Sequence, residues 1–319
     1  MALARVLATA VFLAAPLLAG AQPYPGRPVH FVVAFAAGGF ADTVARLLGV
    51  KVAERLGQPV VVENRGGAGG NIASKLVAAA APDGYTILVN TAAMAINANL
   101  YKDPGFNALA DFAPVMITAS APEVFAVNAS APANTLEELI RSHKEKRLTY
   151  ATAGIGSSSH LAGDTLFRRL AGLDAVHVPY QGGAPAITAT LSGQVSAISL
   201  TLPPMLAFIR QGRLRALAVA SRTRIAALPN VPTLSEAGYG ELEAGSWVGF
   251  FAPAKTSPEI VAKLNAALSE ALGMADVRER FAALSVEPSA GAPAEIAAGF
   301  RHQVENWGRM VKASGVTAN

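Results

Sequence analysis

The chain has 319 residues, of which 52% are hydrophobic and 15% are charged, and its formal net charge is +4. This composition excludes intrinsic disorder and favours a well-packed globular protein, and the length favours two lobes over one compact domain. The net charge is small for this length, and no basic segment contains interspersed aromatic residues. The sequence therefore gives no indication of a nucleic-acid partner.

The N-terminal segment MALARVLATAVFLAAPLLAGAQ has the parts of a secretory signal peptide. Arg5 precedes an apolar run from Val6 to Leu18, and small residues at A-x-A spacing end at Ala21. We expect residues 1–21 to be removed and the mature protein to be exported. A membrane anchor is the alternative, but the apolar run is short for a bilayer span and Pro16 interrupts it.

Strands and helices alternate through the first part of the mature chain. Short apolar runs predict buried strands at residues 29–35, 59–64 and 85–91. Apolar residues at helical spacing predict a helix over 42–56, and a glycine-rich loop leads to a second helix. This alternation is typical of an α/β protein with a largely parallel sheet.

The second part of the chain repeats this plan. Strands are predicted at residues 148–152, 175–180 and 215–220, helices follow the first two of them, and the C-terminal part is helical. We therefore expect two α/β lobes that face a cleft. A boundary near residues 120–130 is suggested by APEVFAVNASAPAN, which predicts a strand and a loop.

The loop GGFAD follows the first predicted strand and precedes the first helix. Gly38 and Gly39 allow unusual backbone angles and a close approach of a ligand to the main chain. The helix start directs unpaired N–H groups at this loop, which favours an anion, and Asp42 is placed to cap the helix. An ordinary strand-to-helix turn explains this loop equally well when it is considered alone.

The loop AGIGSSSH precedes a helix in the second part of the chain and offers hydroxyls and backbone donors. GIGSSS resembles a dinucleotide fingerprint, but Ser159 replaces its third glycine and the loop lies far from the first strand. A catalytic serine is possible, although no G-x-S-x-G elbow occurs. For His160 we favour a packed, hydrogen-bonded helix residue over a catalytic base.

Other motifs give no indication of a cofactor or a metal. RGGAGGNIASK lacks the G-K-[ST] ending of a phosphate loop, so a tight connection that packs a helix on the sheet is the better interpretation. The sequence has no Cys, and its five His residues show no metal-ligand spacing. Trp247 is as well suited to a cleft wall as to a core.

The feature that carries most weight is the pair of small-residue loops, one in each predicted lobe, each before a helix start. A ligand between them would meet backbone N–H groups and hydroxyls from both sides. Such a site favours a small carboxylate without requiring Arg or Lys. Binding could close the lobes by a hinge motion.

At these residues the sequence resembles a known family, the extracytoplasmic solute receptors of tripartite tricarboxylate transporters, also called the Bug family. The resemblance runs from about Tyr24 to the C-terminus. It rests on several segments together, among them PYPGRPVHFVVAFAAGGFADTVAR, VVVENRGGAGGNIASKLVAAAAPDGYTIL, YATAGIGSSSHLAGDTLF, VHVPYQGGAPAITATLSGQV, GRLRALAVASRTRIAALPNVPTLSEAGY and WVGFFAPAKT.

This resemblance implies a two-lobed type II periplasmic-binding-protein fold with the ligand cleft between the lobes. Residues 22–124 and 247–319 would form lobe 1, with the C-terminal helices returning to it, and residues 125–246 would form lobe 2. The family binds small carboxylated molecules through backbone groups, hydroxyls and bridging waters. By similarity, ligand contacts in this chain would involve Ala37, Gly38, Gly39, Phe40, Asp42 (supporting the turn), Thr91, Thr152, Gly156, Ser157, Ser158, His160, Tyr180 and Gly182.

The sequence departs from the family pattern in two places. After GQV the family commonly has an acid and then a Phe-Asp pair, whereas this chain has Ser196, Ser199 and Leu200 at those positions. If the missing acids shape the distal end of the ligand in relatives, specificity differs here. Ala37 stands where a proline is common.

The leading hypothesis is therefore a periplasmic receptor that captures a small organic acid and delivers it to the membrane subunits of a transporter. It would be a monomer and would need no cofactor. A receptor that passes its loaded state to a signalling partner is the alternative. A hydrolase using Ser158 or Ser159 with His160 is a third possibility, for which the sequence identifies neither an acid partner nor an oxyanion hole.

Overall fold

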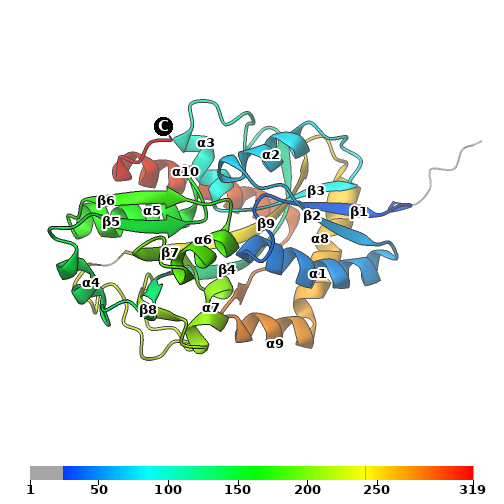
Figure 1. The fold of residues 1–319 in the computed structure, drawn as a ribbon. Helices are drawn as coiled ribbons and strands as arrows, with labels where there is room; N and C mark the ends of the chain where they lie inside the picture. The colour runs from blue at the N-terminus through cyan, green and yellow to red at the C-terminus, as the bar shows by residue number, and fades with distance from the viewer. Residues whose placement is uncertain (1–23, 241, 319) are drawn as a thin grey trace, which may run out of the picture.

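The computed structural model describes residues 24–240 and 242–318, so the predicted signal peptide lies outside the described residues. Two groups of strands and helices lie side by side in Figure 1, one drawn in blue, cyan and orange and the other in green, with β4 and β9 between them. The α/β class predicted from the sequence is confirmed. In the part of the chain described here, no helix combines the length and apolarity needed to cross a bilayer.

The first sheet contains three parallel strands from the N-terminal part of the chain. The strand β1 (Val29–Val33) pairs in parallel with β2 (Val60–Asn64) and β3 (Thr86–Thr91), and β3 pairs antiparallel with β9 (Gly245–Pro253). The helices of this part are α1 (Phe40–Leu56), the short 3-10 turn η1 (Ala68–Gly70), α2 (Asn71–Ala78) and α3 (Ala93–Leu100).

The second sheet is built around another parallel trio. The strand β5 (Leu148–Thr152) pairs with β6 (Ala175–Pro179) and β7 (Ala197–Thr201). The remaining elements are α4 (Leu136–Ser142), α5 (Ser158–Asp164), which continues as the π-helix η2 (Thr165–Leu170), α6 (Gly183–Leu191), α7 (Leu202–Arg210) and β8 (Leu214–Val219).

The long strand β4 (Phe112–Asn128) joins the two sheets. Its residues 112–122 pair with β9 in the first sheet, and residues 123–128 pair with β7 and β8 in the second. The chain returns beside this point, where the N–H of Glu123 donates to the carbonyl of Ala244 and the N–H of Ala220 donates to the carbonyl of Glu123. Both crossings lie within two residues of the predicted lobe boundaries, and the division itself stays a prediction.

The C-terminal helices pack on the first sheet. They are α8 (Pro258–Gly273), α9 (Ala275–Ala283) and α10 (Pro293–Ser314), with the short strand β10 (Glu287–Pro288) pairing with β4. Helix α8 packs against α1, and α10 packs against α3. Trp247, whose role the sequence left open, lies in this core and contacts Phe251 and Phe300.

Regular local patterns predicted most elements, and the differences have local causes. Helix α1 begins at Phe40, two residues before the predicted start, because Gly39 has the extended backbone of an N-cap residue. The strands β7 and β9 and helix α7 were not predicted. Their sequences, AISLT, GSWVGFFAP and LPPMLAFIR, lack a clear period because β7 and β9 are almost wholly buried and α7 is short.

Arg215 stabilises the segment that leaves β4. Its guanidinium donates to the carbonyls of Ala129, Ala131 and Ala133. We expect Arg215→Met to lower the free energy of unfolding by about 2 kcal/mol, because partly buried carbonyls lose their donors. Urea unfolding followed by circular dichroism measures the change, with the exposed Arg210→Met as the control. Equal stability of the two variants would contradict this role.

Candidate functional site

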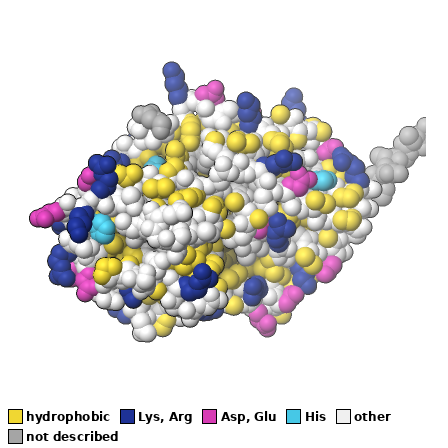
Figure 2. All heavy atoms as spheres, in the orientation of Figure 1, with side chains coloured by type: hydrophobic (Ala, Val, Ile, Leu, Met, Phe, Trp, Pro, Cys, Tyr) yellow, Lys and Arg dark blue, Asp and Glu magenta, His cyan; other side chains and the backbone are white. Residues whose placement is uncertain are grey.

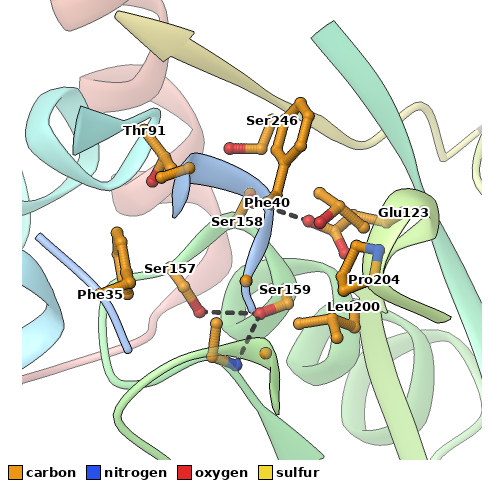
Figure 3. Close-up of a pocket in the computed structure, with 15 residues that line it drawn as sticks. Phe35, Phe40, Thr91, Glu123, Ser157, Ser158, Ser159, Leu200, Pro204 and Ser246 are labelled. Atoms are coloured by element: carbon orange, nitrogen blue, oxygen red, sulfur yellow. Dashed lines mark hydrogen bonds between the residues drawn. The ribbon is translucent and has the colours of Figure 1, made fainter. Parts of the chain in front are cut away.

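A pocket lies where the two sheets meet (Figure 3). It encloses about 400 Å³, including space that opens to solvent. Its walls come from the starts of four helices and from strand residues of both sheets. The lining residues are Phe35, Gly39, Phe40, Ala41, Thr91, Glu123, Ala153, Ser157, Ser158, Ser159, Gly183, Leu200, Thr201, Pro204 and Ser246.

The turn before α1 is fixed by Asp42. Its carboxylate accepts hydrogen bonds from the N–H of Gly38 at 2.9 Å, from Asn64 Nδ2 at 2.9 Å and from Arg46 Nε at 3.0 Å. Although burial opposes it, these donors lower the pKa of the Asp42 carboxyl. Asp42 thus supports the turn as expected, from the third residue of the helix and not as its N-cap.

The same contacts determine which donors of α1 a ligand can use. The N–H of Gly38 is occupied by Asp42, and Gly38 has a φ of 77°, a conformation that favours glycine. Phe40 and Ala41 are the first two residues of the helix and line the pocket. The described chain supplies no hydrogen-bond partner for their N–H groups, because the first turn of a helix has no preceding carbonyls to use.

The serine hydroxyls at the start of α5 are largely committed to one another. Ser157 Oγ donates to the carbonyl of Gly154 at 2.6 Å and accepts from the N–H of His160. A hydroxyl has one proton, so the 2.8 Å contact between Ser157 and Ser159 is donated by Ser159. Ser158 Oγ donates to Glu123 Oε1 at 2.6 Å. These three hydroxyls therefore position the loop, and none has a second proton for a ligand.

The backbone of α5 supplies the free donors instead. Ser158 and Ser159 are its first two residues, both line the pocket, and among the described residues neither N–H has an acceptor. The start of α6, at Gly183, borders the same space. Helix starts with unpaired N–H groups carry partial positive charge, so the pocket is suited to an anion.

Strand side chains add further polar groups. Thr91 Oγ1 accepts from the N–H of Ala93 at 3.3 Å and keeps its own proton. Ser246 Oγ and Glu123 Oε2 are buried and have no hydrogen-bond partner in the described structure. A buried polar atom without a partner is costly, which indicates that a ligand or water completes these sites.

The lining contains no Lys, Arg or His residue. Phe35, Phe40, Leu200 and Pro204 form apolar walls around the polar groups. On the molecular face in Figure 2, positive and negative side chains are interspersed. Recognition of an anion here would depend on helix N–H groups and hydroxyls, as the sequence predicts.

The loops of the two sheets touch directly around the pocket. The N–H of Ala36 donates to the carbonyl of Gln181 at 2.9 Å. A Cβ on Gly182 would lie 3.0 Å from Ala36 N, and one on Gly69 would lie 2.1 Å from the carbonyl oxygen of Ile155. Glycines at these positions allow the backbones to approach, so the loops of the two sheets are in contact beside the pocket.

Of the residues predicted to contact a ligand, some line the pocket and others lie around it. Gly39, Phe40, Thr91, Ser157 and Ser158 line it. The others hold the loops or lie beside them, and their ligand contacts stay a prediction: Ala37, Gly38, Asp42, Thr152, Gly156, His160, Tyr180 and Gly182. Tyr180 borders a neighbouring cavity, together with Gly67–Gly70 and Gly154, and this cavity shares Phe35 and Ala153 with the pocket.

His160 lies beneath the serine loop and packs against a second histidine. Its ring stacks on His177 with centroids 3.9 Å apart, and its Nδ1 accepts from the N–H of Gly156. His177 Nε2 is 2.6 Å from Thr152 Oγ1. These contacts agree with a packed helix residue. No hydrogen bond joins His160 to Ser158 or Ser159 in the described structure, so the pair needed for a serine hydrolase is not formed.

Several lining residues were not predicted. Glu123 is the most informative, and the signal for it was a single acid in the otherwise apolar strand segment APEVFAVN. Ser246 and Thr201 come from strands that lacked a clear period. Among the departures from the family pattern, Leu200 lines the pocket and Ser199 lies beside it in the core, whereas Ser196 is hydrogen-bonded to Thr149.

Comparisons with known proteins match this architecture. A profile of the family described as tripartite tricarboxylate transporter family receptor matches residues 44–316. The structure of the periplasmic binding protein BugD has a TM-score of 0.88 and 37% identity, covering 92% of this chain and 99% of that one.

Two further solved structures contain a bound acid. MatC from Rhodopseudomonas palustris, with bound malate, has a TM-score of 0.84 and 36% identity over 90% of this chain and 100% of that one. Rpa4515 from R. palustris, with adipate, has a TM-score of 0.87 and 32% identity over 92% and 99%. The predicted periplasmic-binding-protein fold is confirmed.

The stacked histidines predict a dependence of stability on pH. Burial lowers the pKa of His160 to about 4 and that of His177 to about 3, below the value of about 6.5 in an unfolded chain. Between the pKa values of the folded and the unfolded state, the unfolded chain binds more protons than the folded protein. The contribution of the two histidines to the free energy of unfolding is therefore complete above pH 6.5 and is lost as the pH falls toward 4.

When the pH falls from 6.5 to 4, the free energy of unfolding should decrease in both the wild type and His160→Asn. We expect the decrease to be smaller in His160→Asn, by about 2 kcal/mol, because the variant lacks one of the two buried groups. Urea unfolding at a series of pH values measures this difference. The exposed His302→Asn is the matched control. If His160→Asn has the same dependence of the free energy of unfolding on pH as the wild type, His160 does not contribute to that dependence.

Proposed function

The chain belongs to the tripartite tricarboxylate transporter receptor family, a family of periplasmic solute receptors, and we propose that it captures a small carboxylate for such a transporter. The acid binds in the pocket between the two sheets, and the loaded receptor delivers it to the membrane subunits. We further propose that the protein acts in the periplasm as a monomer, after removal of residues 1–21.

The convergence of helix starts on one buried pocket carries this proposal. Among the described residues the N–H groups of Phe40, Ala41, Ser158 and Ser159 have no acceptor, and they lie on its two sides. A carboxylate satisfies several such donors at once and is stabilised by the helix dipoles. Thr91 supplies a further donor. The absence of cationic side chains from the lining means that binding depends on fixed dipoles, as in other anion sites of this kind.

The bound acids of the two solved relatives suggest the class of ligand. Malate and adipate are both dicarboxylates, although of different length. We infer that this chain also takes a small mono- or dicarboxylate, with one carboxylate at the helix starts. Phe35, Leu200 and Pro204 would contact the hydrocarbon part of the molecule.

The other predicted site residues act in this proposal by holding the loops. Asp42 fixes the turn before α1, and His160 supports the serine loop. Gly182 lets the loop before α6 approach Ala36. Lobe closure around the acid would use the crossing of β4 and the return of the chain at Ala244, because these connect the two sheets.

A thermal-shift screen of organic acids tests the function. At about 100 times the dissociation constant a bound acid adds about 2.7 kcal/mol, which raises the Tm of a chain of this size by about 5 °C. The panel includes malate, adipate, acidic amino acids and aromatic acids, with their amides as uncharged controls. An ester substrate tested in parallel detects hydrolysis. A panel without any shift, or turnover that Ser158→Ala abolishes, would contradict a receptor role.

We expect Gly39→Val to weaken carboxylate binding by about tenfold or more while the Tm of the empty protein changes little. Gly39 has a φ of −80°, so its backbone accepts a side chain, but a Cβ would lie 3.3 Å from the Ala36 carbonyl oxygen and 3.6 Å from Gly183 N. The larger side chain therefore obstructs the pocket and the contact between the loops.

Isothermal titration calorimetry with the best acid of the panel measures this effect. Gly299→Val, at an exposed position of α10 where a Cβ would meet no atom within 4 Å, is the matched control and should bind normally. Unchanged affinity of Gly39→Val would remove this turn from the binding site.

A further inference from the structure

Glu123 lies at the point where β4 passes from one sheet to the other. Residues before it pair with β9, and Glu123 itself pairs with Thr201 of β7. Its side chain is fully buried, with an exposed fraction of 0%, and it lines the pocket. Figure 3 shows its carboxyl group beside Ser158, in the same space as Phe40 and Ser246. An acid at this position therefore meets any ligand that the helix starts bind.

The two oxygens of Glu123 differ in their surroundings. Oε1 accepts the hydroxyl proton of Ser158 at 2.6 Å, whereas Oε2 is buried without a hydrogen-bond partner in the described structure. The pocket around Oε2 offers no Lys or Arg. Oε2 thus has two ways to be satisfied: it accepts a hydrogen bond from the ligand, or it carries a proton and donates a hydrogen bond to the ligand.

The charged groups on the neighbouring elements do not decide between these states. They include Asp42 and Arg46 on α1, His160 and Asp164 on α5 (Asp164 paired with Arg168), Arg210 on α7 and the Arg222–Glu243 pair beside the crossing. Burial raises the pKa of the Glu123 carboxyl, the hydrogen bond from Ser158 opposes that rise, and no charged side chain of the described residues is among the causes of the shift. The ligand itself is therefore the charge that matters most.

A carboxylate ligand makes the protonated state the favourable one. Two ionised carboxylates in contact repel each other strongly in a site that excludes water, and such pairs take up one proton and share it. A protonated Glu123 would give a short, charge-assisted O–H···O⁻ hydrogen bond to the acid. Ser158 can still donate to the carbonyl oxygen of the neutral carboxyl group.

We propose that Glu123 is a specificity-determining residue that is protonated in the loaded receptor and donates a hydrogen bond from Oε2 to a carboxylate oxygen of the captured acid. This inference rests on the proposed function, because it requires an anionic ligand. The proton comes from solvent and returns to it on release. Glu123 selects for ligands with an acceptor at this position, and it couples binding to the uptake of one proton.

The electrostatics of the empty pocket agree with this assignment. Burial raises the pKa of Glu123 to about 7, and the hydrogen bond from Ser158 opposes this rise only in part. A bound anion raises the pKa further. Below pH 7 the carboxyl group is already neutral and binding is independent of pH. Above pH 7 binding must first protonate Glu123, so affinity falls by up to tenfold for each pH unit.

Calorimetric titration of the full mature protein with adipate and with malate between pH 6 and pH 9 tests this inference. Wild-type affinity should be highest near pH 6 and fall above pH 7, with uptake of about one proton, as shown by measurements in buffers of different ionisation enthalpy. In Glu123→Gln the amide N–H takes the place of the O–H of protonated Glu123 as the hydrogen-bond donor. The affinity of this variant at pH 6 should therefore stay within about threefold of the wild-type value and should not depend on pH. At pH 9 this variant should bind more tightly than the wild type.

Two further variants complete the experiment. Glu123→Met removes the donor and should weaken binding at pH 6 by about tenfold or more, since free acceptor atoms of the ligand lose a partner. Exposed Glu145→Gln should keep the wild-type pH profile. Circular dichroism and the Tm of each empty variant exclude a folding defect as the cause.

The outcomes separate this inference from the proposed function. Tight binding of an acid with a flat wild-type profile would overturn the role of Glu123 and leave the receptor function in place. Loss of binding in Glu123→Gln, with wild-type affinity that rises with pH, would show an ionised Glu123 that accepts from the ligand. If neither acid binds at pH 6, the carboxylate function fails and this inference fails with it.

Discussion

The structure of the site depends on one constraint: buried N–H groups at a helix start must find an acceptor. The starts of α1 and α5 lie at different sheets, and in the described structure the first residues of both helices have unpaired N–H groups and line the same pocket. Because the lining has no cationic side chain, the partial charges of these helices supply the attraction for an anion. The surrounding side chains mainly position the two loops, as Asp42 does for α1 and Ser157 does for α5.

An acid in such a pocket is unexpected until its surroundings are considered. Glu123 is on the strand that both sheets share, its Oε2 has no hydrogen-bond partner in the described structure, and its neighbour Ser158 occupies only Oε1. Burial of this kind favours the neutral form, in which a carboxyl group is a hydrogen-bond donor. The pocket then combines a donor that depends on pH, the Glu123 carboxyl group, with backbone N–H donors that do not. The affinity of the receptor for an acid therefore depends on the pH of its surroundings.

The predictions from sequence were best where local patterns decide the structure. Apolar runs located β1, β2, β3, β5 and β6, and glycines or serines before a helical spacing located the loops that line the pocket. The contribution of individual side chains was harder to predict. The three serines were expected to offer hydroxyls to a ligand, but Ser157 and Ser158 donate to Gly154 and Glu123, so the backbone N–H groups are the free donors.

The sequence by itself determined the alternation of strands and helices, the two glycine- or serine-rich loops at helix starts and the family, because these depend on spacing along the chain. Only the tertiary structure decided that the two loops share one pocket and that Glu123 and Ser246 face into it. Glu123 and Ser158 are 35 residues apart, and their contact exists because β4 crosses between the sheets beside α5. Burial and the partners of a polar atom are properties of this packing, which no local pattern records.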